Sequence, residues 1–183
     1  MSVTANEVIG SLFNPDDVVC FRVFDDKKGS VFSGAKLECE AGKYLAFEPK
    51  LKEHHEKNRG VFFVVNYGGQ EDTAISRINA QFVEMDDLSF EEQQKLIDAF
   101  PLPPSMIIKT RKSLHTYWFM KNATVERFRT IQKQLVAHFH GDPMCVNESR
   151  VMRLPDFNHC KADPIAVECI SFHPERKYTQ AEL

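Results

Sequence analysis

The chain has 183 residues, of which 43% are hydrophobic and 27% charged, and its formal net charge is −3. This composition is that of an ordinary soluble globular protein with one domain, or with one domain and a small subdomain. It argues against a strongly basic protein that coats DNA through charge alone. It is compatible with an enzyme whose acidic metal site offsets local basic patches.

The cysteines and the N-terminus indicate the compartment. The five cysteines are odd in number and none lies in a CxxC pair, which favours a reducing environment over a disulfide framework. The opening stretch "MSVTANEVIGSLFNPDD" has no basic segment followed by a sustained apolar one. No apolar run approaches the ~20 residues of a membrane span. We therefore expect a cytoplasmic protein with no membrane partner.

Residues 1–59 are expected to form an N-terminal α/β portion. The pattern predicts a short helix at 4–12 and strands at 18–24 and 43–47, with the polar loop "DDKKGSVFSG" between the two strands. The stretch "EPKLKEHHEKN" predicts a solvated helix that ends at Gly60.

Residues 60–183 carry clearer signals. "GVFFVVN" is a β-branched and aromatic run typical of a buried strand. A capping box begins a helix at Ser89. The expected elements, in order, are strands at 60–66 and 80–86, a helix at 89–100, the hairpin "MIIKT" and "HTYWFM", a long helix after Thr124, a helical turn in "NESRVMRL" and the strand "PIAVECISF". We therefore predict an α+β fold in one compact unit: a ferredoxin- or RRM-like antiparallel sheet with packed helices, plus the N-terminal portion.

The first candidate motif is "FVEMDD". In an extended strand Glu84 and Asp86 share one face, with their α-carbons roughly 7 Å apart, while Val83 and Met85 share the other. Two neighbouring carboxylates repel each other unless a cation lies between them. The pair is either a solvated strand end or a set of hard oxygen ligands for Mg²⁺ or Mn²⁺.

The second motif is "KTRKSLHTYWF". Ser113 and His115 share one face if the segment is extended, and Lys109, Arg111 and Lys112 form the densest basic cluster of the chain. A hydroxyl, an imidazole and several cations together offer strong donors to a polyphosphate. The alternative is a basic hairpin with a half-buried histidine.

The third motif is "GDPMCVNESRVMRLPDFNHCK". Asp142 follows a long helix, where a third carboxylate can reach the first two, although Gly-Asp-Pro alone predicts an ordinary turn. Arg150 and Arg153 are spaced to share one face of a helical turn.

Together, the three motifs resemble the archaeo-eukaryotic primase superfamily, most closely the small RepB-type and phage or mobile-element primase-polymerases. That family has a hydrophobic strand ending in two acids, then Ser-x-His, then a third acid after a helix. "VVCFRVFDD", "VFFVVNYGG" and "SRVMRLPDFNHCK" are also similar to it, so that the resemblance covers about residues 18–165. Glu84 stands where the family more often has Asp, which lengthens this ligand by one methylene.

The resemblance implies template-dependent nucleotidyl transfer, compatible with ribo- or deoxyribonucleotides. Glu84, Asp86 and Asp142 would hold two divalent ions, Mg²⁺ or Mn²⁺. Nucleotide phosphates would contact Ser113, His115, Arg111 and Arg150. Further contacts to nucleotide or template are expected from Lys109, Lys112, Arg153, Asn158, His159 and Lys161, with Asn66 and Arg77 lining the same cleft. The implied partners are single-stranded DNA, nucleoside triphosphates and a helicase or another replication protein.

Other interpretations stay open at this point. A rolling-circle replication endonuclease needs paired histidines, which "HFH" at 138–140 mimics, and a tyrosine nucleophile on a nearby helix. A catalytically degenerate module that binds single-stranded nucleic acid is the non-enzymatic alternative. No zinc is expected, because the spacing of the candidate zinc ligands fits no common template; these are His138, His140, Cys145, His159 and Cys160. Four aromatic residues are assigned to the core: Phe82, Trp118, Phe119 and Phe128.

Overall fold

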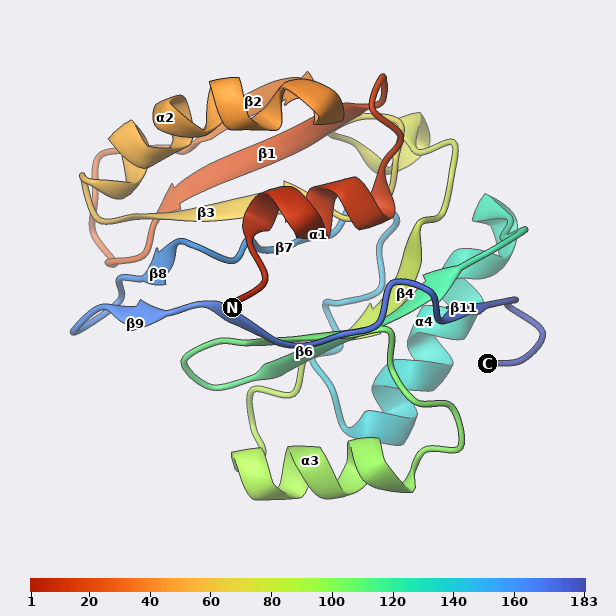
Figure 1. Ribbon diagram of the computed structural model, residues 1–183. Coiled ribbons are helices and arrows are strands. Elements are labelled where there is room, and N and C mark those ends of the chain that lie inside the picture. Colours follow the sequence, from red (N-terminus) through yellow and green to blue (C-terminus); the bar gives the residue numbers. More distant parts are fainter.

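The strands of the chain form two main sheets, which are largely antiparallel (Figure 1). This computed structural model describes residues 1–183. The first sheet has the order β2-β1-β3-β7. Its strands are β1 (Val18–Asp25), β2 (Ala35–Glu40), β3 (Arg59–Val64) and β7 (Val151–Arg153). Because β3 and β7 pair with β1 or with each other, the first sheet extends beyond the predicted N-terminal portion, residues 1–59.

The second sheet has β6 at its centre, paired with β5 on one edge and β4 on the other. Strand β10 extends the sheet beyond β5, and β11 runs parallel to the end of β6. Its strands are β4 (Ala80–Val83), β5 (Met106–Lys109), β6 (Leu114–Met120), β10 (Glu168–Phe172) and β11 (Lys177–Tyr178), while β8 (Asn158–His159) and β9 (Ile165–Ala166) form a separate small hairpin. The predicted α+β class with antiparallel sheets and packed helices is confirmed.

Helices α2, α3 and α4 cover the outer sides of the sheets. Figure 1 shows α2 above the first sheet and α3 and α4 below the second. The helices are α1 (Ala5–Leu12), α2 (Tyr44–His55), α3 (Phe90–Ala99) and α4 (Val125–Phe139), with short 3₁₀ turns at Ala41–Lys43 and Asp72–Ala74. Thr4 and Ser89 begin α1 and α3 with capping boxes, as such sequences favour. None of the helices is long and apolar enough to span a membrane.

The two sheets share one hydrophobic core, because 41 buried residues form a single continuous cluster. Strand β1 shows how the sequence divides its side chains between two environments. Val19, Phe21 and Val23 are fully buried on one face, where Phe21 packs against Tyr44 of α2. The residues that alternate with them, including Arg22 and Phe24, point to the opposite face of the sheet.

Two elements of the N-terminal portion differ from the prediction. The expected strand at 43–47 is the first part of α2, whose buried and half-buried positions Tyr44, Phe47 and Leu51 recur at helical spacing. The missing strand is β2, whose burial merely alternates between exposed and intermediate. Gly60 lies inside β3 and does not end α2; Asn58, with φ of 60°, adopts the left-handed conformation after the helix.

Later elements agree more closely with the prediction. The strand at 60–66, the helix beginning after Ser89, the hairpin and the long helix after Thr124 are all present. The strand predicted at 80–86 ends earlier, at Val83. The "NESRVMRL" segment is not a helical turn, because Val151–Arg153 pairs with β3, and the final strand is divided between β9 and β10.

Three connections carry the chain between the sheets. Residues 154–167 lead from β7 through the β8–β9 hairpin to β10; the other two are joined to each other. Residues 65–79 lead from β3 to β4, and residues 140–150 lead from α4 to β7. The connection 65–79 turns at Gly68, where φ is 146° and an added Cβ would collide with the Ala74 backbone. Asp72 joins these last two connections by accepting hydrogen bonds from the Ser149 hydroxyl at 2.7 Å and its N–H at 3.0 Å.

Candidate active site

A cleft with a cavity volume of about 660 Å³ opens between the two sheets. Only four of its 19 lining residues are hydrophobic. The wall from the second sheet and its loops carries Glu84, Asp86, Thr110, Arg111, Lys112, His115 and Asp142; the wall from the first sheet and its loops carries Arg22, Phe24, Asp25, Asp26, Lys28, Phe62, Arg150, Val151, Met152 and Arg153; His159 and Lys161 come from the small hairpin. A cleft of this size suits a small ligand, and its polar lining suits a charged one.

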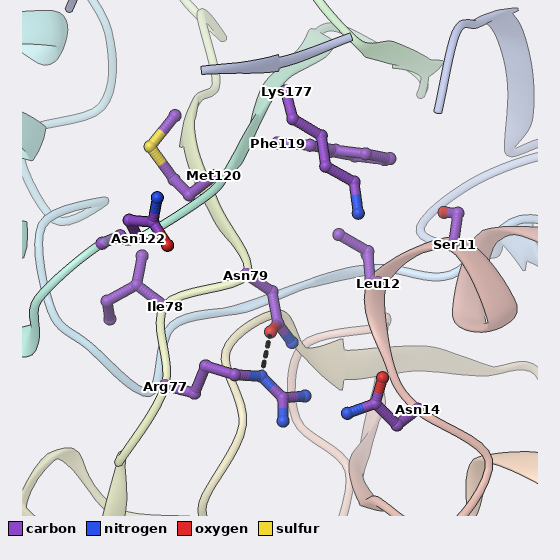
Figure 2. Close-up of a pocket in the computed structure, with 11 residues that line it drawn as sticks. Ser11, Leu12, Asn14, Arg77, Ile78, Asn79, Phe119, Met120, Asn122 and Lys177 are labelled. Atoms are coloured by element: carbon purple, nitrogen blue, oxygen red, sulfur yellow. Dashed lines mark hydrogen bonds between the residues drawn. The ribbon is translucent and has the colours of Figure 1, made fainter. Parts of the chain in front are cut away.

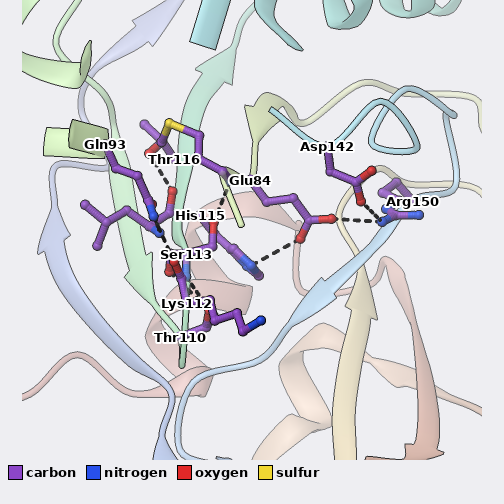
Figure 3. A network of polar contacts seen from close by, with 11 residues as sticks. Glu84, Gln93, Thr110, Lys112, Ser113, His115, Thr116, Asp142 and Arg150 are labelled. Carbon is purple, nitrogen blue, oxygen red and sulfur yellow. Dashed lines mark hydrogen bonds and ion pairs between the residues drawn. The ribbon is translucent and has the colours of Figure 1, made fainter. Parts of the chain in front are cut away.

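Glu84 lies at the centre of a network that spans the cleft (Figure 3). Its Oε2 is 3.2 Å from His115 Nε2, and its Oε1 accepts a hydrogen bond from Arg150 Nη2 at 2.8 Å. Burial opposes ionisation of Glu84, but the hydrogen bonds and charges of His115 and Arg150 outweigh it and hold the pKa well below its usual value. The side chain is therefore a fixed anion, only 13% exposed.

Asp142 reaches Glu84 through backbone and side-chain contacts. The Asp142 N–H donates to the Glu84 carbonyl oxygen at 2.9 Å, so the loop after α4 is attached to the end of β4. The Asp142 Oδ2 lies 3.2 Å from the same Arg150 Nη2 that contacts Glu84. The predicted third carboxylate thus lies beside the first, with a guanidinium between them.

Asp86 is the most exposed of the three acids and forms no ion pair. Partial burial raises its pKa, and the negative charges of Glu84 and Asp142 raise it further. Although β4 ends at Val83, the side chains still alternate beyond it: Glu84 and Asp86 line the cleft and Met85 is fully buried. Asp86 therefore lies on the same side of the chain as Glu84, and the two carboxylates are close enough to repel each other.

Ser113 and His115 have different surroundings. His115 lines the cleft, as predicted. The fully buried Ser113 does not line it; its hydroxyl accepts a hydrogen bond from the Met85 N–H at 2.7 Å. Ser113 therefore fixes the acidic segment in place, and the structure gives no direct contact for it with a ligand in the cleft.

Buried glutamines that the sequence analysis missed support this arrangement. Gln93 of α3 donates to the Lys112 carbonyl at 2.8 Å and accepts from the Leu114 N–H at 2.6 Å, which positions the turn before His115. Gln132 of α4 accepts from the Phe82 N–H at 3.0 Å and donates to the Cys145 carbonyl at 2.8 Å. Both amides are fully buried and satisfied.

The predicted basic residues divide into two groups. Arg111, Lys112, Arg153, His159 and Lys161 line the cleft. Arg111 also donates to the His159 carbonyl at 3.2 Å, which attaches the β8–β9 hairpin to the second sheet. Burial, aided by the charge of Arg153, lowers the pKa of His159 to about 4, so it is neutral near pH 7. Lys109 and Asn158 lie outside the cleft lining, with Lys109 Nζ 4.8 Å from the centre of the Phe90 ring.

Asn66 and Arg77 do not line the cleft, contrary to the expectation. Asn66 is a buried joint: its side chain accepts from the Asn79 N–H at 2.9 Å and donates to the Glu148 carbonyl at 3.1 Å. Arg77 pairs with Asp17 and lines a separate cavity of about 350 Å³ near α1 and the end of β6 (Figure 2).

The chemistry of the three acids fits a divalent metal. Carboxylate oxygens are the ligands that Mg²⁺ and Mn²⁺ prefer, and all three carboxylates line one cleft. No three His, Cys, Asp or Glu side chains are gathered closely enough to surround an ion. Arg150 instead contacts both Glu84 and Asp142. The positive charge beside Glu84 and Asp142 in this structure is therefore the Arg150 guanidinium.

The histidines and tyrosines of the rolling-circle interpretation do not form a site. His138 packs on Phe100 at 5.2 Å between ring centres, and neither His138 nor His140 lines the cleft. Tyr44 does lie on a helix, α2, but it is fully buried against the first sheet, and Tyr117 is fully buried in β6. The four aromatic residues assigned to the core, Phe82, Trp118, Phe119 and Phe128, are indeed buried there.

Solved structures with the same fold define the class. The primase-polymerase (AEP) domain of cyanophage S-2L is similar with a TM-score of 0.81 and 23% identity, over 95% of this chain and 91% of that chain. The primase RepB′ is similar with a TM-score of 0.68 and 18% identity, over 93% of this chain and 57% of that chain. Its catalytic domain in complex with initiator DNA gives a TM-score of 0.68 at 16% identity, over 94% of this chain and 87% of that chain. The chain therefore has the fold of an archaeo-eukaryotic primase core.

The family follows from the sequence. The model of the RepB DNA-primase N-terminal domain matches residues 67–168, which is more than half of the chain. The protein belongs to this family, and the predicted resemblance is confirmed. All three acids, His115 and Arg150 lie within the matched range. No curated protein matches the sequence.

Proposed function

We propose that this protein is a primase or primase-polymerase that joins nucleotides on a single-stranded DNA template by a two-metal-ion mechanism. The observation that carries the proposal is the convergence of Glu84, Asp86 and Asp142 with His115 and Arg150 in one polar cleft. Membership of a DNA-primase family and the fold of primase domains support it. Such chemistry depends mainly on positioning and on stabilising negative charge.

The three carboxylates would hold the metal ions. If Mg²⁺ or Mn²⁺ were held by Glu84, Asp86 and Asp142, it would supply activation of the attacking hydroxyl and stabilisation of the leaving pyrophosphate. Arg150 contacts the same oxygens of Glu84 and Asp142 that a divalent ion would take, so it would compete with the ion and would be released when the ion binds. A released Arg150 can contact the triphosphate as a planar, bidentate donor.

Three other side chains complete the phosphate site. His115 is held at the cleft by Glu84 and offers a donor beside the acids. Lys112, immediately before the buried Ser113, lines the cleft, as does Arg111. These donors lie on the rigid β5–β6 hairpin, which Gln93 positions, so little freedom is lost when a nucleotide binds. Ser113 contributes by holding the acidic segment.

The partners of the proposed reaction are single-stranded DNA and nucleoside triphosphates, with a helicase or another replication protein as a further partner. The catalytic domain of RepB′ was solved with initiator DNA, which supports binding of DNA by this related chain. All five cysteines are free, which supports a reducing compartment such as the cytoplasm.

The test is synthesis itself. The protein is incubated with single-stranded DNA, nucleotides and Mn²⁺ or Mg²⁺, and new chains are resolved on a denaturing gel, with ribo- and deoxyribonucleotides in separate reactions. We expect metal-dependent products. Single-stranded binding that needs no metal, without any synthesis under these conditions, would instead identify a binding module.

A further inference from the structure

The cleft wall formed by the first sheet carries a row of side chains with a cation–aromatic–cation pattern. Strand pairing places Arg22 of β1 opposite Phe62 of β3, and Phe62 opposite Arg153 of β7. Residues opposite one another in a sheet point to the same face, so all three face the second sheet across the cleft. Phe24, two residues after Arg22, lies on the same face and also lines the cleft.

The Phe24 ring is open to the cleft, whose other lining residues are mostly polar, and the Phe62 ring beside it is half-buried. Phe24 is 38% exposed, and its ring centre lies 5.6 Å from that of Phe62 in an edge arrangement. The Arg153 guanidinium lies 4.6 Å from the centre of the Phe62 ring. Packing within the protein does not explain why an aromatic ring is exposed inside a charged cleft. An exposed ring does offer a flat apolar surface to a ligand.

Two glycines leave room for the Phe24 ring and for the ion pair near it. Gly60 is the partner of Phe24 on β3, and a Cβ there would lie 2.7 Å from Asp26 Oδ1 and 2.8 Å from Arg153 Nη1. Gly34 lies against the ring, where a Cβ would be 3.1 Å from Cδ1. A side chain at Gly60 would therefore displace the Asp26–Arg153 ion pair that borders the rings.

The charges of this wall are arranged for an anionic chain. Asp26 is paired with Arg153 at 2.7 Å, and Asp25 lies 3.8 Å from Arg59. These acids are neutralised within the protein, while Arg22 is held by hydrogen bonds to Gln70 and Lys28 lies at the same wall. Two cations beside two rings match the phosphates and the bases of one strand.

We infer that Arg22, Lys28, Phe24 and Phe62, which we term the stacking wall, bind a nucleobase on the rings and its neighbouring phosphate on the cations. This inference rests on the proposed function, since it assumes that the cleft receives nucleotides. The base belongs to a DNA strand or to a free nucleotide, because the chemistry of stacking is the same for both. The wall that carries Glu84, Asp86 and Asp142, which we term the acidic wall, would thus contact a different part of the substrate from the stacking wall.

The test compares strands with and without bases. Binding of a labelled oligo-dT and of an abasic strand of equal length is measured by fluorescence anisotropy without metal, for the wild type, Phe24→Ala, Phe24→Trp and Arg22→Ala. Binding of free nucleoside triphosphate is measured separately by calorimetry. Leu45→Ala, at an exposed residue of α2 outside the cleft, is the matched control.

We expect Phe24→Ala to weaken oligo-dT binding about 5- to 100-fold, as loss of one base stack does, while abasic-strand binding changes little. Phe24→Trp should restore the affinity, Arg22→Ala should weaken both strands, and Leu45→Ala should change neither. If Phe24→Ala weakens only the binding of free nucleoside triphosphate, the inference is supported and the base that stacks on the wall belongs to that nucleotide.

Two results separate this inference from the proposed function. If the wild type synthesises new chains and Phe24→Ala binds both strands and nucleotide normally, the stacking wall is wrong and the primase function stands. If binding of bases depends on Phe24 but the wild type makes no product, the stacking wall is supported and the proposed primase function is wrong. Because Phe24 is partly exposed, its variants should fold, and an unchanged circular dichroism spectrum and melting temperature verify this.

Discussion

The two walls of the cleft use their charged residues in opposite ways. In the acidic wall, Glu84 contacts His115, and both Glu84 and Asp142 contact Arg150, which reaches them from the first sheet, so that of the three acids only Asp86 has no partner. Beside the stacking wall, Asp25 and Asp26 are paired with arginines of their own sheet, while Phe24 is partly exposed and Arg22 forms no ion pair. One wall is therefore organised around reacting groups, and the other around a surface on which a substrate can lie.

The joint between the walls explains how they keep their spacing. The connections 65–79 and 140–150 are held together by two buried or half-buried polar side chains, Asn66 and Asp72. Neither contacts the cleft lining directly. Because the connection 140–150 carries Asp142 and ends at Arg150, which both line the cleft, a change in the joint should alter the distance between the walls more than the chemistry of either.

The largest expected effect is the loss of synthesis when the unpaired acid is neutralised. Asp86→Asn should lower the synthesis rate by at least about 100-fold, since even groups that only support metal ligands are worth about 10–100-fold. Nucleotide incorporation at saturating Mn²⁺, measured beside the wild type, tests this. Asp87→Asn, one residue further along in the exposed turn, is the matched control and should remain active. An active Asp86→Asn enzyme would contradict the role of the acidic wall.

The same wall predicts a contrast in stability. Asp86→Ala removes a charge that its neighbours repel, so it should leave the melting temperature unchanged or slightly higher. Glu84→Ala removes the partner of His115 and Arg150 and should destabilise the protein by about 1.5–3 kcal/mol. Thermal unfolding of both variants separates an acid that only binds a ligand from one that also holds the fold.

The next effect concerns His115. If it binds nucleotide phosphate, His115→Ala should weaken nucleotide affinity by about 10- to 100-fold, as loss of a hydrogen bond to a charged group does. Affinity for oligo-dT without nucleotide should be nearly unchanged, because the strand is expected on the other wall. Calorimetry and anisotropy measure the two affinities. An equal loss of both, or an unfolded variant, would assign His115 to the core.

The site residues differ in how readily the sequence reveals them. Glu84 and Asp86 could be paired from sequence because strand alternation depends only on neighbouring residues, and it persists past the end of β4. The stacking wall could not be predicted, although "FRVFDD" does place Arg22 and Phe24 opposite the buried face. The residues that lie beside Arg22 and Phe24 on that face come from β3 and β7, which are distant in the sequence and are brought there by strand pairing.

The fold shows the same limit. The helix beginning at Ser89 was predictable because its capping box is a local signal. The short strand β7 was predicted as a helical turn because the spacing of Arg150 and Arg153 fits a helix, and only its pairing with Phe62 makes it a strand. Buried amides such as Gln93 give no local signal, since their partners are backbone groups of other elements.

A smaller effect is the dependence of strand binding on salt. Seven cations and five carboxylates line the cleft, so its net positive charge is low. Three or four phosphate contacts to single-stranded DNA give a log–log slope of about −2 to −3. Metal and nucleotide should tighten binding, because they neutralise the acidic wall. Anisotropy at several salt concentrations, with and without Mn²⁺ and nucleotide, tests both statements. Tight binding that does not change with salt, Mn²⁺ or nucleotide would favour a binding module.

The smallest expected effect is at the joint between the walls. Burial opposes ionisation of Asp72, but its hydrogen bonds from Ser149 and Asn147 outweigh this and lower its pKa to about 2. Because the pKa of Asp72 is lower in the folded than in the unfolded protein, where it is near 4, its ionised form stabilises the fold at any pH above about 4. This stabilisation is lost as the pH falls toward 2. Since Asp72 is partly exposed, Asp72→Asn should lower the melting temperature at pH 7 by only about 2–4 °C. The difference from the wild type should narrow between pH 4 and 2; a difference that stays constant with pH would show that shape, and not charge, holds the joint.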